Sequence, residues 1–286
     1  MSNYIDILNS FKPILSKEKV NIYLIKFEKS RDFLLKELGK VRYNSFKAVG
    51  IGVNSDNNSD LDEFDLKATH LILWHKDNNE IVGGYRLFKS SELINSEGIY
   101  NTYLSDIFDF SEEFKKNIPL SAEVGRSFVA EKYWRGNYLD LLWCGIGKFL
   151  LLNSHIRYLY GTISMSNNYS ENAIALILNY YRKWYYLDGD LVFIKSKYRV
   201  SNDVQDYCDN ILNGMDSKED FVKLKKELIV LRHAIPVLFR KYIGLTEEKG
   251  TLFLGFGVDE DFNSIAALLR VDLTMINESF RSRYLI

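Results

Sequence analysis

The sequence predicts an α/β (α+β) protein built on one mixed, mainly antiparallel central sheet with helices on its faces. Segments with strand and helix patterns alternate along the chain, which is typical of a sheet covered by helices. Several of the strand segments follow one another through short turns, as antiparallel strands do. No stretch rich in Pro, Gly or Ser divides the 286 residues, so we expect a single domain over residues 1–286.

The first segments predict an N-terminal arm followed by a strand and a helix. Apolar residues recur at helical spacing up to Pro13, so residues 1–18 should form a short amphipathic arm that either docks on the core or rests on a membrane. A strand over 20–27 and a helix over 30–46 follow, with Ser30 as the helix N-cap. Residues 50–60 are rich in Asn, Ser, Gly and Asp and predict a loop.

The middle of the chain predicts the centre of the sheet. Two strands, 68–74 and 81–88, are separated by a polar hairpin turn. Short helices are expected within 92–118, one of them starting at Ser111. The buried strand 119–129 contains a glycine, and Gly125 is where a β-bulge is expected.

The last segments predict two more helices, two strands and a C-terminal part that completes the sheet. We expect a core over residues 19–200 and C-terminal helices and strands over 201–286. The segments, in order, are a helix over 138–154, a strand over 157–165, a helix over 171–186, a strand over 191–200, two helices within 203–232 separated by Gly214, and strands over 250–257 and 267–273.

Composition narrows the possible functions. Apolar residues make up 47% of the chain and charged residues 26%, as in an ordinary soluble protein. The 37 basic and 38 acidic side chains give a net charge of −1, so nucleic-acid binding is not expected. Cys144 and Cys208 have no partner at metal-ligand spacing, and His70 lies in an apolar strand as a core histidine would. We therefore expect reduced cysteines, no metal and no bound cofactor.

The chain shows no secretory signal, which favours a cytoplasmic protein. Its longest apolar run, 139–152, is too short to span a bilayer. Peripheral contact with the inner membrane remains an open alternative.

A set of charged residues lies inside or beside apolar, strand-like stretches, where an unpaired charge costs several kcal/mol. Three arginines in the set suit bidentate recognition of a substrate carboxylate or pairing with the acidic members. The first two acidic residues could instead cap the strand that begins at Ala68. The set comprises Arg42 with the nearby Phe46, Asp62, Asp65, Arg86, Glu123 and Arg126.

These residues form an ordered series of motifs that resembles a known family. The motifs are Arg-x-x-x-Phe, Asp-x-Phe-Asp, Gly-x-Tyr-Arg-Leu and Glu-x-Gly-Arg-Ser-x-Val, and further matches continue through residues 141–143, 160–164, 236–242 and 261–265. The series is similar to the N-acyltransferase branch of the GCN5-related (GNAT) superfamily. Within it, the chain most resembles ornithine-lipid and glycine-lipid N-acyltransferases, often labelled hemolysins, with acyl-homoserine-lactone synthases as cousins. The resemblance implies a GNAT-like fold and covers most of the chain.

The resemblance also implies roles for individual residues. It assigns the acceptor end of the site to Arg42, Phe46, Asp62, Asp65, Arg86 and Arg126. Transfer from a thioester to an amine needs a base, and Glu123 in its buried strand is the candidate. Alternatively, Glu123 is only an ion-pair partner of Arg126 or Arg86. A backbone N–H freed by the bulge near Ser127 or Phe128 would bind the oxyanion.

The donor end is expected just after this strand. In acetyl-transferring GNAT enzymes a Gly-rich turn and a helix N-terminus bind the pyrophosphate of coenzyme A. Here that segment, residues 133–138, has one Arg and one Gly, which suits the single phosphate of acyl carrier protein better than acyl-coenzyme A. Lys132, Arg135 and Gly136 are the candidate carrier-binding residues.

The sequence therefore predicts an enzyme that moves a (3-hydroxy)fatty acyl group from acyl carrier protein to the α-amino group of ornithine or glycine, forming a lyso-aminolipid. An acyl-homoserine-lactone synthase using S-adenosylmethionine is the alternative. It is disfavoured by the matching C-terminal segment and by the absence of Trp within 46–52. A non-catalytic acyl-binding or membrane-active protein is a third possibility. The sequence does not support it, because it shows no pattern of membrane-spanning helices or strands.

Overall fold

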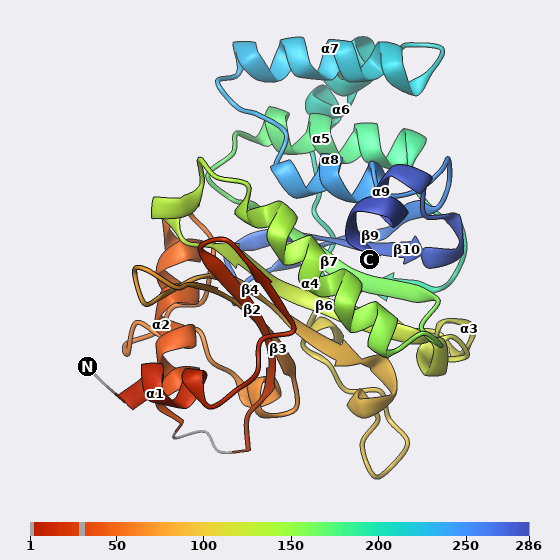
Figure 1. Cartoon of the computed structure of the whole chain (residues 1–286). Coiled ribbons are helices and arrows are strands. Elements are labelled where there is room, and N and C mark those ends of the chain that lie inside the picture. The colour runs from red at the N-terminus through yellow and green to blue at the C-terminus, as the bar shows by residue number, and fades with distance from the viewer. Residues whose placement is uncertain (1–2, 29–31, 286) are drawn as a thin grey trace.

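The computed structural model describes residues 3–28 and 32–285, which build one eight-stranded sheet in the order β1-β2-β3-β4-β6-β7-β10-β9 (Figure 1). Neighbouring strands are antiparallel except β6 and β7, which run parallel. The predicted mixed, mainly antiparallel sheet is confirmed. The strands are β1 Leu15–Lys17, β2 Val20–Lys26, β3 Thr69–His75, β4 Glu80–Lys89, β6 Ser121–Val129, β7 Tyr158–Ser166, β9 Thr251–Asp259 and β10 Ser264–Asp272.

The N-terminal arm is shorter than the predicted helix. Helix α1 spans Asn3–Asn9, whereas Leu15–Lys17 form an edge strand that pairs with β2. The prediction of a helical arm to residue 18 was therefore wrong beyond Asn9. Pro13 cannot extend a helix, because it lacks the N–H, and the chain after it is free to join the sheet.

The N-cap of the next helix lies two residues after the predicted one. Ser30 lies outside the described residues, and the cap of helix α2 (Phe33–Ala48) is Asp32, whose carboxylate accepts hydrogen bonds from the N–H groups of Leu34 and Leu35.

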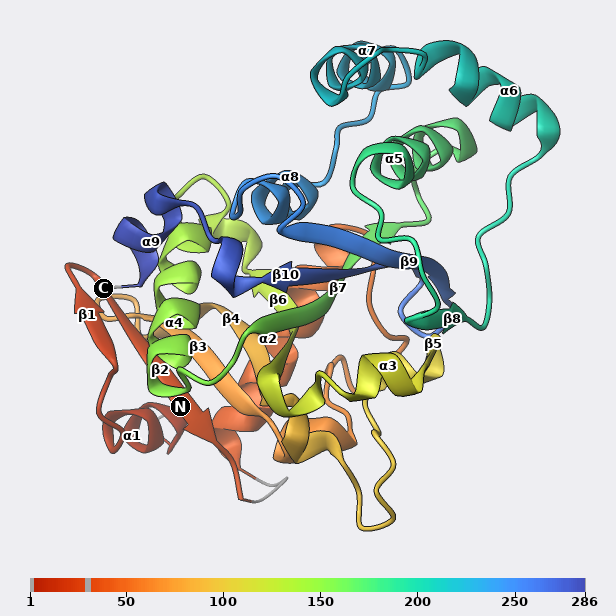
Figure 2. The ribbon, with the colours of Figure 1, turned by 90° about the vertical axis from the view of Figure 1, so that its right-hand side faces the viewer.

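Helices cover both faces of the sheet (Figures 1 and 2). The larger apolar core lies between one face and helices α4, α5, α8 and α9, and helices α6 and α7 pack beyond α5. The other face is covered by α1 and α2 and by the segment 90–118, which contains helix α3. The bounds are α3 Glu112–Lys115, α4 Tyr138–Leu152, α5 Glu171–Trp184, α6 Asn202–Ile211, α7 Ser217–Val230, α8 Val237–Ile243 and α9 Glu278–Tyr284.

The predicted strand over 191–200 was wrong in its length and in its place in the central sheet. Only Val192–Ile194 (β8) is a strand, and it pairs with β5 (Phe108–Phe110) in a separate two-stranded sheet. Lysines and a serine follow Ile194, and their exposed side chains do not suit a central strand. The C-terminal strands do complete the main sheet as predicted, because β10 pairs with β7 along its length and β9 forms the edge.

Within the described part of the chain, no helix is both long and apolar enough to cross a bilayer. Both cysteines are buried and unbridged, as predicted. His70 is a buried core histidine as predicted, with Nε2 2.8 Å from the Asp65 carbonyl oxygen.

Candidate functional site

The two parallel strands at the centre of the sheet diverge. β6 and β7 pair only where Ser121–Glu123 meet Tyr158–Tyr160. Beyond that point β6 stays with β4, whereas β7 stays with β10. The strands therefore separate like the arms of a V, and the space between them is not filled by the backbone.

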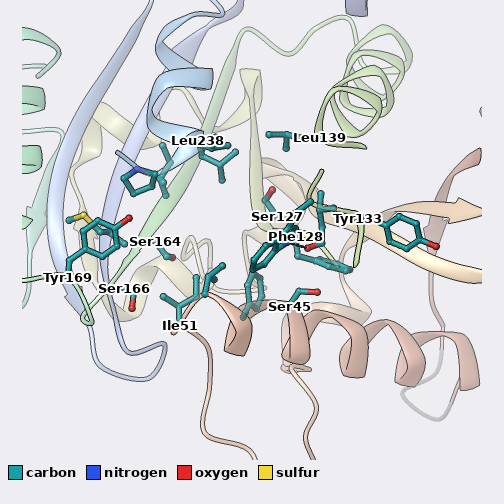
Figure 3. A pocket seen from close by; sticks show the side chains of 18 of the residues that line it. Ser45, Ile51, Ser127, Phe128, Tyr133, Leu139, Ser164, Ser166, Tyr169 and Leu238 are labelled. Atoms are coloured by element: carbon teal, nitrogen blue, oxygen red, sulfur yellow. Dashed lines mark hydrogen bonds between the residues drawn. The ribbon is translucent and has the colours of Figure 1, made fainter. Parts of the chain in front are cut away.

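A cavity of about 440 Å³ occupies this V (Figure 3). Ser127 and Phe128 line it from β6, and Ser164 and Ser166 line it from β7. Apolar side chains of α2 and its following loop, of α4 and of α8 supply most of the remaining wall. Three apolar residues of the wall are about half exposed and mark an opening to solvent, namely Val49, Trp134 and Val237. A mostly apolar cavity with a few hydroxyl groups suits an alkyl chain that ends in a polar group.

A β-bulge lies on the cavity side of β6. Arg86 faces Gly125 and Gly84 faces Phe128, so Arg126 and Ser127 together oppose the single residue Tyr85. Arg126 has a φ of 49°, a left-handed conformation that is uncommon for a residue other than glycine. The bulge is thus confirmed, one residue after Gly125, and such an extra residue leaves backbone groups outside the strand ladder.

The N-terminus of α4 borders the same cavity. Gly136 and Leu139 line it, and the N-cap residue Asn137 makes no side-chain capping bond. The first N–H groups of this 15-residue helix are therefore available to an anion. Of the predicted carrier-binding residues, Gly136 lies at the cavity, whereas Lys132 and Arg135 are exposed. Lys132 forms an ion pair of 2.5 Å with Glu80.

Glu123 lies deep in the sheet and does not line the cavity. Its Oε2 accepts hydrogen bonds from the Tyr100 hydroxyl at 3.1 Å and the Thr102 hydroxyl at 2.5 Å. Burial raises the pKa of this carboxyl group. Among the residues described, no ion pair joins it to Arg86 or Arg126, so the alternative of a simple ion-pair partner is not what the structure shows.

Arg42 is a buried brace. It is 1% exposed and its guanidinium donates to Asp65 in a bidentate pair, at 2.9 and 3.0 Å, and to the carboxylate of Asp60 at 3.1 Å. Another N–H bonds the Asp60 carbonyl. Although burial alone would raise the pKa of Asp65, the neighbouring Arg42 and Arg86 hold it well below its usual range. Arg42 is therefore buried beside the site, and its guanidinium donates to oxygens of Asp60 and Asp65.

The other two arginines share the remaining carboxylate. Arg86 donates to Asp62 at 2.6 Å, and Arg126 donates to the second oxygen of Asp62 at 3.4 Å. Arg126 is also 3.4 Å from Asp60 and lies between the rings of Tyr103 and Phe262. The charge cluster of Arg42, Arg86, Arg126, Asp60, Asp62 and Asp65 is therefore balanced, three against three.

Asp62 and Asp65 do not cap the strand at Ala68, as one sequence interpretation proposed, but a 3₁₀ turn over Glu63–Leu66. Asp62 accepts from the N–H of Phe64, and Asp65 accepts from the N–H of Asp62. The capping fixes both carboxylates where the arginines reach them.

Open space borders Gly125 on the face of the sheet that carries the charge cluster, and we call this space the recess. A Cβ placed on Gly125 would meet no atom within 4 Å, so this part of the strand borders open space. Gly125 shares its face with Glu123 two residues away, because strand side chains alternate. Thr162 and Ser164 on β7 are half-buried on the same face, and Ser164 also lines the cavity. The recess and the apolar cavity are therefore neighbours.

Comparison with known proteins agrees with this geometry. A family model described as an acetyltransferase (GNAT) domain matches residues 41–144, which include the charge cluster, the bulge and the start of α4. A glycine N(α)-acyltransferase of Phocaeicola vulgatus is 28% identical over 269 residues, covering 88% of this chain and 81% of the relative. One of Bacteroides thetaiotaomicron is 27% identical over 243 residues, covering 81% of this chain and 71% of the relative.

The chain is an acyltransferase, and its residues 41–144 match the GNAT domain. Solved structures with a similar arrangement over most of the acyltransferase include the acyl-homoserine-lactone synthase LasI, with a TM-score of 0.46, 12% identity and coverage of 93% of this chain and 94% of the other. FeeM, an N-acyl amino acid synthase from uncultured soil microbes, has a TM-score of 0.44, 10% identity and coverage of 93% and 96%.

The acyltransferase brings most of the predicted residues together, in two groups. Phe46, Ser127, Phe128 and Gly136 line the cavity, and the predicted arginines and aspartates form the charge cluster. The ring of Phe262 contacts both groups, since its centroid is 4.9 Å from that of Phe46 and 4.5 Å from the guanidinium of Arg126. The side chain of Glu123 belongs to neither group.

Sequence reasoning missed several residues of the acyltransferase site. Asp60 is the last residue of a polar loop. The sequence indicates its role only indirectly, because a buried Arg42 requires carboxylate partners. Tyr103 donates to both oxygens of Asp259, at 2.9 and 3.1 Å, although 156 positions separate them. Burial raises the pKa of Asp259. A contact between such distant positions leaves no trace in local sequence patterns.

Proposed function

We propose that the acyltransferase moves a long acyl group from a thioester to the amino group of glycine, forming an N-acylglycine, a lyso-glycine lipid. The observation that carries the proposal is the open recess at Gly125 beside an apolar cavity in the V of β6 and β7. The amine nitrogen attacks the thioester carbonyl, the carbon–sulfur bond breaks, and the amine proton leaves as the amide forms. The thiol of the carrier is released.

The cavity is the proposed donor site. Its apolar wall would hold the acyl chain, since each buried methylene contributes about 0.8 kcal/mol. The N-terminus of α4, beside Gly136, would bind the phosphate of the pantetheine arm. A single helix terminus without a Gly-rich turn fits one phosphate, which favours acyl carrier protein over coenzyme A as donor. Lys132 and Arg135, exposed on the preceding turn, would meet the acidic carrier.

The bulge is the proposed oxyanion site, because it lies where the cavity meets the strand. Ser127 and Phe128 line the cavity directly after Arg126, so an N–H turned out of the ladder there would face the thioester carbonyl. Preorganised donors of this kind act most strongly where water is excluded.

The recess is the proposed acceptor site. Glu123 would take the amine proton through its Oε1, since both of its hydrogen bonds go to Oε2, and its raised pKa brings it closer to the range of an effective base. The guanidinium of Arg126 would attract the carboxylate of the amino acid, because among the described residues its Nε is in an ion pair of 3.4 Å with Asp60 but in no hydrogen bond. Glycine is favoured over ornithine because the two relatives compared above are glycine N(α)-acyltransferases.

The test is to incubate the purified chain with 3-hydroxyacyl carrier protein or the matching acyl-coenzyme A, with pooled amino acids and S-adenosylmethionine, and to identify products by mass spectrometry. We expect N-acylglycine, faster from the carrier protein. Glu123→Gln should abolish it, whereas Glu131→Gln, an exposed acid beyond the end of the same strand, should not. An acyl-homoserine lactone would assign the alternative activity, and no release of carrier thiol would refute acyl transfer from this donor.

A further inference from the structure

Helix α7 presents aliphatic and cationic side chains interleaved on one exposed face. Val222, Ile229 and Val230 are 46%, 74% and 72% exposed, which is unusual for residues of this size. Three exposed lysines lie among them at the spacing that places residues on one side of a helix. The outer face of α7 consists of Lys218, Val222, Lys225, Lys226, Ile229 and Val230.

The outer face is fixed in its exposed orientation. Asp220, which is fully buried, accepts hydrogen bonds from Lys183 at 2.8 Å and Trp184 at 2.9 Å, both on or at the end of α5. Leu224 and Leu228 are buried on the same side of α7 as Asp220. Because these contacts hold the helix by its inner side, the aliphatic residues of the outer face cannot turn inward. In both views α7 is the outermost element at the top of the molecule (Figures 1 and 2).

The outer face also carries positive charge that the helix does not neutralise. Glu219 pairs with Lys223 at 2.7 Å, and Glu227 accepts a hydrogen bond from Tyr207 on α6. Among the described residues, no ion pair involves the three lysines of the outer face. Acidic side chains nearby, Asp203, Asp206 and Asp209, belong to the neighbouring helix α6.

We propose that the outer face of α7 docks on an anionic membrane surface. Exposed aliphatic residues interleaved with lysines are the pattern of a helix that lies in the lipid interface, where the aliphatic groups enter the acyl boundary and the lysines meet the headgroups. A purely solvated face needs no aliphatic residues, and an acidic protein surface would pair the lysines but would not account for the aliphatic residues among them.

The position of α7 relates the docking face to the cavity. The chain passes from α7 through residues 231–236 directly into α8, where Val237 and Leu238 line the cavity and Val237 is 48% exposed. Docking would therefore bring an opening of the cavity toward the bilayer side of the molecule. The docking itself is independent of the proposed function, and only the release of a long-chain product into the bilayer rests on it.

The test is co-sedimentation of the full chain with vesicles of phosphatidylglycerol and phosphatidylcholine, compared with phosphatidylcholine alone. We expect binding to the anionic vesicles that weakens with salt and falls about tenfold in Ile229→Ser/Val230→Ser and in Lys225→Glu/Lys226→Glu. Leu152→Ser is the matched control, because Leu152 is 71% exposed on α4 and lies outside the outer face. It should bind as the unchanged chain does. Urea unfolding of each variant checks that the fold is retained.

Three results would overturn the proposal. One is the absence of binding to anionic vesicles, and another is equal binding by all variants. The third is that the α7 substitutions change carrier-protein binding, or the mass of the chain in sedimentation velocity, while vesicle binding stays the same. That result would assign the face to the carrier or to a second copy of the chain.

Discussion

Replacing Gly125 with valine tests whether the recess holds the acceptor. A Cβ at Gly125 would meet no atom within 4 Å, so the new side chain extends into open space without moving its neighbours. Valine favours strand structure over glycine by up to about 1 kcal/mol, so the free energy of unfolding should stay level or rise. Gly84→Ala is the contrasting change, since its Cβ would lie 2.7 Å from the Leu71 carbonyl oxygen and should destabilise the sheet.

The catalytic effect of Gly125→Val should fall on the amino acid alone. Displacing a reacting amine by about 1 Å can slow a reaction about 100-fold, and we expect a loss of that order in kcat/KM for glycine. Gly125→Ala should show a smaller loss. The affinity for the acyl donor, measured by titration of carrier protein in the absence of amino acid, should not change. Unaltered kcat/KM for glycine in a folded Gly125→Val variant would refute the placement of the acceptor at this strand.

Three further changes test the charge cluster and the site. Arg42→Met removes the nearest cationic partner of two buried aspartates and should lower the free energy of unfolding in urea by about 3–5 kcal/mol, whereas an unchanged midpoint would contradict the role of a brace. Burial lowers the pKa of His70 to about 4, so the unfolded chain binds the proton at a higher pH than the folded chain does. Stability should therefore fall by about 3 kcal/mol as the pH drops from 6.5 to 4. His70→Gln should remove most of this slope in urea titrations, because the lowered pKa of Asp65 costs stability mainly below the ordinary aspartate value of 3.8. If Glu123 is the base, kcat/KM should decline as the pH falls through its raised pKa, and a profile that is the same in Glu123→Gln would exclude it.

Local sequence patterns predicted the strands of the sheet better than they predicted which strands pair. The alternation of strands 68–74 and 81–88, and a glycine in a buried strand, were enough to predict the centre of the sheet and its bulge. The pairing of β5 with β8 was not predictable, because each strand has three residues and the two lie far apart in sequence. β1 was taken for helix because its apolar residues continue the helical spacing past Pro13.

The residues of the candidate site were largely predicted, but their separation into a charge cluster and a cavity lining was not. Motif order gathered the charged residues correctly, yet only the structure separates those that brace the fold from those that border the cavity. Arg42 is an example, since its burial depends on Asp60, which no motif includes. Glu123 is another, because its partners Tyr100 and Thr102 come from an irregular segment whose path over the sheet follows from packing alone.

The short contact between β6 and β7 makes the sheet two antiparallel halves, β1 to β6 and β7 to β9, joined in the main sheet by three residue pairs. One wall of the cavity belongs to each half, so the angle between the halves sets the width available to a bound chain. Distant parts of the sequence meet here, because the other edge of β7 pairs with β10. Strand β10 thus supports one wall of a cavity whose opposite wall, on β6, lies more than a hundred residues earlier in the sequence.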